Sequence, residues 1–116
     1  MAITLTAEML EHAYEYLCCQ KPFNTWNLPP SEDVKFLVIR SADRYAHYQM
    51  VGGVHHIAVS TKFVGRHEVL IATIAHELIH MHCRNARIYM RNPHGKAFKK
   101  LADDVCKAHD FDRLTF

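Results

Sequence analysis

The sequence lacks the features that mark a membrane or secreted protein. No apolar run reaches the ~18 residues needed to cross a bilayer. Residues 1–15 lack the basic segment and following apolar stretch of a secretion signal. None of the four cysteines belongs to a Cys-x-x-Cys pair, so neither a zinc ribbon nor a redox dithiol is indicated. These absences predict a cytoplasmic protein with reduced thiols and no membrane association.

Acidic side chains are missing from residues 83–100, although the whole chain has a net charge of only +2. The basic residues there are Arg84, Arg87, Arg91, Lys96, Lys99 and Lys100. Two interpretations are open: a solvated face of two helices, or a patch that contacts the phosphates of nucleic acid. Aromatic residues for base stacking are sparse in this segment. Any such binding should therefore follow the backbone, depend on salt and depend little on sequence.

With 116 residues and 49% hydrophobic side chains, the chain suits one domain, 1–116, with its own core. Apolar periodicity and β-branched composition predict helices at about 7–19, 67–87 and 94–108, and strands at about 35–40, 45–51 and 55–60. Gly52-Gly53 suits a tight turn between the last two strands. We expect an α+β fold in which a three-stranded antiparallel sheet packs with these helices.

His76, Glu77 and His80 form a His-Glu-x-x-His motif inside the apolar run 69–81. Residues i and i+4 lie one turn apart on the same face of a helix, so His76 and His80 can bind one metal ion together. Glu77 is rotated by about 100° from His76, near a water on the metal rather than among the ligands. This arrangement is typical of zinc hydrolysis, where the ion acidifies water and a carboxylate takes the proton.

A catalytic zinc ion usually has three protein ligands, so a third must come from elsewhere in the chain. The metzincin position holds Ala86, and the gluzincin class fails because no glutamate follows the motif. The remaining candidates are His82, His94, Asp103, Asp104 and His109. His82 points to the opposite side of the helix. His94 is the best placed, since it follows a loop that can fold back and precedes Gly95, which permits close backbone approach.

Segments 76–80 (His-Glu-Leu-Ile-His) and 94–98 (His-Gly-Lys-Ala-Phe) together resemble the SprT-like (Spartan-type) metallopeptidase domain. In that family a zinc helix, a loop and His-Gly-x-x-Phe at the next helix follow one another. The resemblance covers most of the chain and is strongest over residues 55–106. It implies a minimal zincin-like fold with one zinc ion per chain. It also implies His76, His80 and His94 as the zinc ligands and Glu77 as the catalytic acid/base.

The resemblance further implies a zinc-dependent metalloendopeptidase that hydrolyses peptide bonds of a protein substrate by Glu-assisted attack of zinc-bound water. Spartan-type proteases cleave proteins crosslinked to DNA, which favours the nucleic-acid interpretation of the basic segment and a role in DNA–protein crosslink repair. Several family members carry a zinc ribbon or DNA-binding tail after this domain. The cysteines for such a ribbon are missing here, so we expect a minimal catalytic domain that depends on a partner for targeting.

Two alternative functions remain open. One is a non-catalytic, zinc-stabilised module that binds nucleic acid or a protein partner, and the other is a zinc hydrolase acting on a non-peptide bond. Two supporting roles are also unassigned. Tyr89, Arg91 or His55 is a candidate oxyanion donor, and Asp103 or Asp104 is a candidate acceptor for the second ring nitrogen of a ligand histidine.

Overall fold

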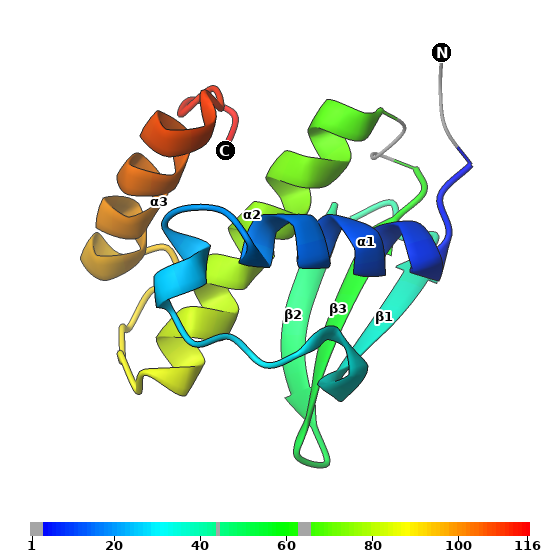
Figure 1. The fold of residues 1–116 in the computed structure, drawn as a ribbon, viewed down its shortest axis with the longest axis horizontal. Helices are drawn as coiled ribbons and strands as arrows, with labels where there is room; N and C mark the ends of the chain where they lie inside the picture. The colour runs from blue at the N-terminus through cyan, green and yellow to red at the C-terminus, as the bar shows by residue number, and fades with distance from the viewer. Residues whose placement is uncertain (1–3, 44, 63–65) are drawn as a thin grey trace.

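The computed structural model describes residues 4–43, 45–62 and 66–116. These form an α+β fold, as expected (Figure 1). The helices are α1 (Ala7–Cys18), α2 (His67–Asn85) and α3 (Lys96–His109), and the strands are β1 (Val34–Ile39), β2 (Ala46–Val51) and β3 (Val54–Ser60). Two short 3-10 helices, Phe23–Thr25 and Ser31–Asp33, lie in the proline-rich stretch between α1 and β1.

The sheet is mixed, so the expected antiparallel sheet is wrong for one of its strand pairs. β2 and β3 pair antiparallel, and the turn between them uses Gly52 and Gly53 at positive φ angles of 58° and 80°. β1 pairs in parallel with the other edge of β3, from Val34 opposite His55 onward. The strand order is therefore β1-β3-β2.

The parallel pairing arises because the chain crosses the end of β3 on its way from β1 to β2. Three hydrogen bonds hold this crossing in place. Ser60 donates its backbone N–H to the Tyr45 oxygen at 2.7 Å and its hydroxyl to the Ser41 oxygen at 2.8 Å, and Thr61 donates to the Ile39 oxygen at 2.9 Å. Strand composition carries no signal for this crossing, which is why the sequence predicts the strands but not their order.

The motif helix α2 lies at the centre of the molecule. It contacts α1, β2, β3 and α3, whereas α3 packs on α2 away from the strands (Figure 1). Ile74, Ala75, Leu78 and Ile79 of α2 are fully buried. Neighbours therefore cover most of the circumference of α2, and burial of these aliphatic side chains stabilises it by about 1.5–3 kcal/mol for each large one. The motif thus sits on a helix that is packed on most of its sides.

α2 ends at a turn that sends the chain back toward the motif. Arg87 adopts a left-handed conformation with φ of 56°. The backbone N–H of Ile88 then donates to the Cys83 oxygen at 2.8 Å, and that of Arg87 donates to the Arg84 oxygen at 3.1 Å. These bonds satisfy carbonyls at the helix end, as in a Schellman motif. The helix therefore stops two residues before the expected end at Arg87, and the next segment returns along it.

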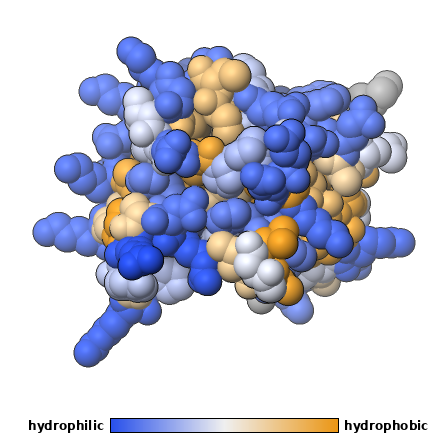
Figure 2. All heavy atoms as spheres, turned by 60° about the horizontal axis from the view of Figure 1, so that its bottom comes forward, coloured by the Kyte–Doolittle hydropathy of each residue, from blue (hydrophilic) through white to orange (hydrophobic). Residues whose placement is uncertain are grey.

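The basic segment lies at the end of α2, the following loop and the start of α3. All six of its arginine and lysine side chains are exposed. Figure 2 turns the lower end of Figure 1 forward and shows a face that is mostly hydrophilic, with smaller hydrophobic groups between. Among the residues described, no helix combines the length and apolar character needed to cross a membrane.

Candidate metal centre

Three histidine side chains converge on one point between α2 and the start of α3. The Nε2 atom of His94 lies 3.1 Å from Nε2 of His76 and 3.2 Å from Nε2 of His80. All three potential ligand atoms lie within 4.8 Å of one another. His76 and His80 come from successive turns of α2, and the returning loop supplies His94. The structure therefore brings together the three histidines that the family resemblance names.

This cluster fits a tetrahedral metal ion. Two nitrogens that each lie ~2.0–2.1 Å from a tetrahedral zinc ion are about 3.3–3.4 Å apart, close to the spacing seen here. Without a cation, the arrangement is unfavourable because one N–H of His94 cannot donate to both neighbours at once, and nitrogen lone pairs face each other. Nitrogen donors at this spacing suit zinc among the common biological metals.

Phe98 forms the floor of the cluster. Its side chain is only 3% exposed. Its ring centroid lies 4.9 Å from that of His76, 4.7 Å from that of His80 and 4.8 Å from that of His94. One aromatic ring therefore contacts all three candidate ligands, which explains why the His-Gly-x-x-Phe segment needs an aromatic residue four positions after His94.

The turn before α3 fixes the backbone of His94. Its N–H donates to the Asn92 side-chain oxygen at 2.9 Å, and the N–H of Gly95 donates to the Asn92 backbone oxygen at 2.9 Å. A Cβ atom on Gly95 would lie 3.0 Å from that backbone oxygen. The contribution of the glycine here is space rather than backbone freedom, since its φ of −73° is open to any residue. This confirms that Gly95 permits a close backbone approach.

Burial keeps the two histidines of α2 neutral, which is the form that binds metal. It lowers the pKa of His80 from 6.5 to about 4, with a further contribution from the neighbouring His76 and His94. Burial also lowers the pKa of His76, although the hydrogen bond to the Phe116 backbone opposes this shift. Ligand nitrogens that stay unprotonated at neutral pH favour metal binding there.

We predict that the zinc-free protein loses stability as the pH falls from 6.5 toward about 4. Because the pKa of His80 is lowered in the folded state, the unfolded chain binds more protons over this window, so acid favours unfolding. Urea unfolding at a series of pH values measures the effect. His80→Gln should flatten the slope, whereas His67→Gln, at the exposed first position of α2, should not. Equal slopes in wild type and His80→Gln would contradict the assignment.

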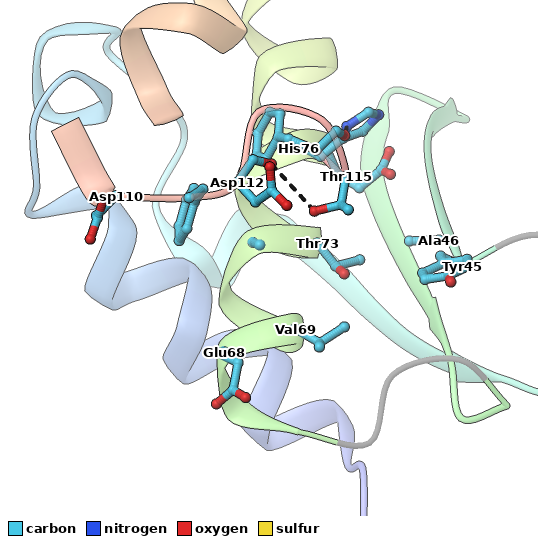
Figure 3. A pocket seen from close by; sticks show the side chains of 13 residues that line it. Tyr45, Ala46, Glu68, Val69, Thr73, His76, Asp110, Asp112 and Thr115 are labelled. Carbon is cyan, nitrogen blue, oxygen red and sulfur yellow. Dashed lines mark hydrogen bonds between the residues drawn. The ribbon is translucent and has the colours of Figure 1, made fainter. Parts of the chain in front are cut away.

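A cleft of about 670 Å³ opens beside the cluster. Its walls come from α2, from the start of β2 and from residues 110–116, which follow α3 (Figure 3). The lining residues are Tyr45, Ala46, Glu68, Val69, Ala72, Thr73, His76, Glu77, Asp110, Phe111, Asp112, Thr115 and Phe116. His80 and His94 do not line it. A molecule in the cleft would therefore approach the metal position from the side of His76 and Glu77.

Glu77 is buried, with 5% of its surface exposed, and it is the motif's carboxylate in the cleft. A buried carboxylate is costly unless it is paired or used. Its place in the cleft wall, next in sequence to His76, puts a carboxylate in the same cavity as one of the three converging histidines.

The other candidates for a third ligand lie elsewhere. His82 stacks on Trp26 with ring centroids 4.4 Å apart. His109 contacts the Lys21 backbone oxygen through Nε2 at 2.6 Å and stacks on Phe111. Asp103 accepts from the Arg113 guanidinium at 2.7 Å. Each of these three has a partner away from the cluster, and Asp104 is also outside the converging group, which among the described residues consists of His76, His80 and His94.

The five residues expected in supporting roles do not line the cleft. Tyr89 and Arg91 are exposed outside the cleft, and His55 contacts the Tyr48 hydroxyl at 2.7 Å. In the described part of the chain, neither Asp103 nor Asp104 accepts a hydrogen bond from His76, His80 or His94. The acceptor for His76 is the backbone oxygen of Phe116, at 2.7 Å from Nδ1.

The hydroxyls and aromatic rings of the cleft are functional candidates that the sequence does not reveal. Tyr45, Thr73 and Thr115 line it, as do Phe111 and Phe116. No motif marks these positions. Thr73 alone had a sequence signal, since it precedes His76 by three residues and so lies on the same helix face. Tyr45 and residues 110–116 reach the cleft only through tertiary packing.

The fold and the cluster together define a class: an α+β domain in which a helix-borne histidine pair and a histidine before the next helix form a candidate metal centre. The chain belongs to the SprT-like family, whose model matches residues 7–115. No curated protein matches the sequence.

Proposed function

We propose that the protein is a zinc-dependent metalloendopeptidase with a minimal zincin-like fold. The observation that carries the proposal is the convergence of the His76, His80 and His94 nitrogens beside a cleft that also contains the Glu77 carboxylate. A purely structural metal site is usually closed by four protein ligands. Here three protein ligands would leave the fourth coordination position of the metal open to water or substrate from the adjacent cleft. This favours a hydrolase over a stabilising metal site.

The chain's own residues divide the work between binding and proton transfer. His76, His80 and His94 would hold zinc, and Phe98 keeps their rings in place. When bound, zinc supplies Lewis acidity, which lowers the pKa of water and polarises a carbonyl. Glu77 accepts a proton at its carboxylate and later delivers it to the leaving amine. Tyr45, which precedes β2, lines the cleft together with Thr73 and Thr115, and we propose that one of these three hydroxyls donates to a developing oxyanion.

The cleft favours an extended peptide as the substrate. It is open and runs along α2 from Glu68 to His76, with apolar side chains of Val69, Ala72 and Phe111 between polar ones (Figure 3). A folded protein surface would not enter such a space, whereas a flexible or unfolded segment would. We therefore propose unfolded or flexible polypeptide as the substrate class.

DNA is the second proposed partner, through the exposed basic segment. Arg84, Arg87, Arg91, Lys96, Lys99 and Lys100 surround the loop that carries His94, and no acidic residue interrupts them. Tyr89, in the same loop, is 88% exposed and can stack on an unpaired base. Phe98 cannot, because it is buried under the histidines. Binding would follow the phosphate backbone and weaken with salt. DNA held by this segment would bring DNA-bound or DNA-crosslinked proteins to the enzyme as substrates.

Cleavage of casein by the zinc-loaded protein tests the proposal. We expect peptide products whose masses together exceed that of the parent segment by one water for each bond cut, and loss of cleavage with a chelator that added zinc reverses. The same assay is repeated with single-stranded DNA and with a DNA-binding protein as substrate. Lys99→Glu should weaken DNA binding and reduce the slope of log K against log salt concentration by about one. Casein cleavage should stay unchanged. Lys107→Glu, on the same helix outside the basic segment, is the matched control.

The possible results separate the three functions. Zinc binding without cleavage of any polypeptide would replace the proposal with a zinc-stabilised binding module. Cleavage of ester or amide substrates but not of polypeptides would indicate a hydrolase of another class. Equal DNA binding by Lys99→Glu and Lys107→Glu would remove DNA as a partner of the basic segment.

A further inference from the structure

Residues 110–116 leave the end of α3 and fold back over the metal centre. Asp110 ends the helix in a left-handed conformation with φ of 59°, and its N–H donates to the Cys106 oxygen. Five residues of this 110–116 segment then line the cleft: Asp110, Phe111, Asp112, Thr115 and Phe116. The segment therefore forms one whole wall of the cleft (Figure 3).

Polar contacts fix the course of the segment. Arg113 forms an ion pair with Asp103 of α3, with 2.7 Å between Nε and Oδ1. The Leu114 N–H donates to the Asp112 carboxylate at 3.0 Å, and the Thr115 hydroxyl donates to the Asp112 backbone oxygen at 3.3 Å. The last turn is therefore anchored to α3 at Arg113 and closed locally by Asp112.

Aromatic contacts continue from α3 to the metal centre. His109 stacks on Phe111 with centroids 5.4 Å apart, and Phe111 stacks on Phe116 at 5.9 Å. The Phe116 ring then contacts His76, with centroids 5.4 Å apart. These ring contacts hold the Phe116 backbone next to the side of His76 that faces away from the other candidate ligands.

The hydrogen bond at the end of this row sets the tautomer of His76. The Phe116 backbone oxygen can only accept, so His76 Nδ1, 2.7 Å away, must carry the proton. In a neutral imidazole the other nitrogen, Nε2, then has a free lone pair. That atom lies 3.1 Å from Nε2 of His94, at the metal position. The backbone oxygen therefore selects the tautomer of His76 that can bind metal.

We infer that the 110–116 segment is a positioning element for the metal centre, acting through the Phe116 backbone oxygen on His76. The inference rests on the proposed zinc site. In the described part of the chain, His76 is the candidate ligand whose second ring nitrogen has a protein acceptor. Such partners orient the ring and raise the basicity of the ligand nitrogen, so their loss weakens metal binding. The same segment therefore lines the substrate cleft and raises the affinity of the site for zinc.

Deletion of residues 111–116 tests the inference, with zinc alone as the probe. We expect the zinc Kd, measured by competition with a chelating dye, to rise by about 10- to 100-fold. Nitrogen-15 NMR of the zinc-free protein should show His76 protonated only at Nδ1 in wild type and as a mixture of tautomers after deletion. Leu114→Ala is the matched control, since Leu114 is 96% exposed and its side chain is separate from the backbone bond.

A second pair of variants covers the case in which the deletion prevents folding. Asp103→Ala removes the ion pair that anchors Arg113, and we expect a rise in the zinc Kd of about two- to fivefold, the worth of an exposed ion pair. Asp104→Ala, the adjacent exposed acid on α3, should leave the Kd unchanged. Phe116→Ala keeps the backbone oxygen, so it separates packing of the ring from the hydrogen bond.

The outcomes distinguish failure of the positioning role of residues 110–116 from failure of the proposed zinc-dependent function. A folded deletion variant that keeps the wild-type zinc Kd and a single His76 tautomer overturns the inference alone. Equal zinc Kd values for Asp103→Ala and Asp104→Ala do the same if the deletion variant is unfolded. A wild-type protein that binds no zinc overturns both the inference and the proposed function.

Discussion

Glu77→Gln should lower kcat for peptide hydrolysis by about 10²–10⁴-fold while the protein keeps its zinc. The amide has nearly the same size as the carboxylate, so the packing around this buried position is retained. It cannot accept a proton, which removes general base catalysis, a contribution of that magnitude. Glu77 is not one of the three converging nitrogen donors, so metal content should stay near that of wild type.

Rates and zinc content measured on the same samples check this expectation. Glu8→Gln, an exposed change of the same type in the first turn of α1, is the matched control and should retain wild-type activity. Full activity in Glu77→Gln would show that another group takes the proton, and the proposed mechanism would then be wrong. Loss of zinc in Glu77→Gln would instead mean that the carboxylate supports the metal centre rather than the reaction.

The sequence predicts the fold well where the signal is local. The apolar pattern of 69–81 predicts the motif helix, because a helix covered on most sides shows nearly continuous hydrophobicity. Gly52-Gly53 predicts the hairpin, because both positions need positive φ. The parallel pairing of β1 depends instead on its register with β3, from Val34 opposite His55 to Ile39 opposite Ser60. These contacts are between segments distant in sequence, and no local pattern encodes them.

The candidate site shows the same division. The helical spacing of His76 and His80 brings their rings together in any intact helix. The position of His94 depends on more than helical spacing. The left-handed turn at Arg87 and the close approach at Gly95 together bring its loop back toward His76 and His80. The family resemblance supplied that residue, whereas spacing alone left several candidates. The acceptor for His76 was beyond prediction, because a backbone oxygen carries no residue-type signal and lies 40 positions away.

His94→Ala should abolish tight zinc binding with little effect on the zinc-free fold. The His94 side chain is exposed, so its loss removes few packing contacts. Its Nε2 atom, however, lies closest to both other donors, and a two-histidine site holds zinc far more weakly than a three-histidine site. We expect the zinc Kd to rise by at least about 100-fold, above the usual effect of losing an outer contact.

Thermal unfolding with and without zinc measures this loss directly. A ligand present at about 1,000 times its Kd stabilises the folded state by about 4 kcal/mol, so zinc should raise the wild-type Tm by about 10–30 °C. In His94→Ala that increase should disappear, while the Tm without zinc stays near the wild-type value. His82→Ala is the matched control, because His82 lies on the same helix as the motif but stacks on Trp26. An undiminished zinc effect in His94→Ala would mean that the metal binds elsewhere, and the cleft beside His76 would then lose its assigned chemistry.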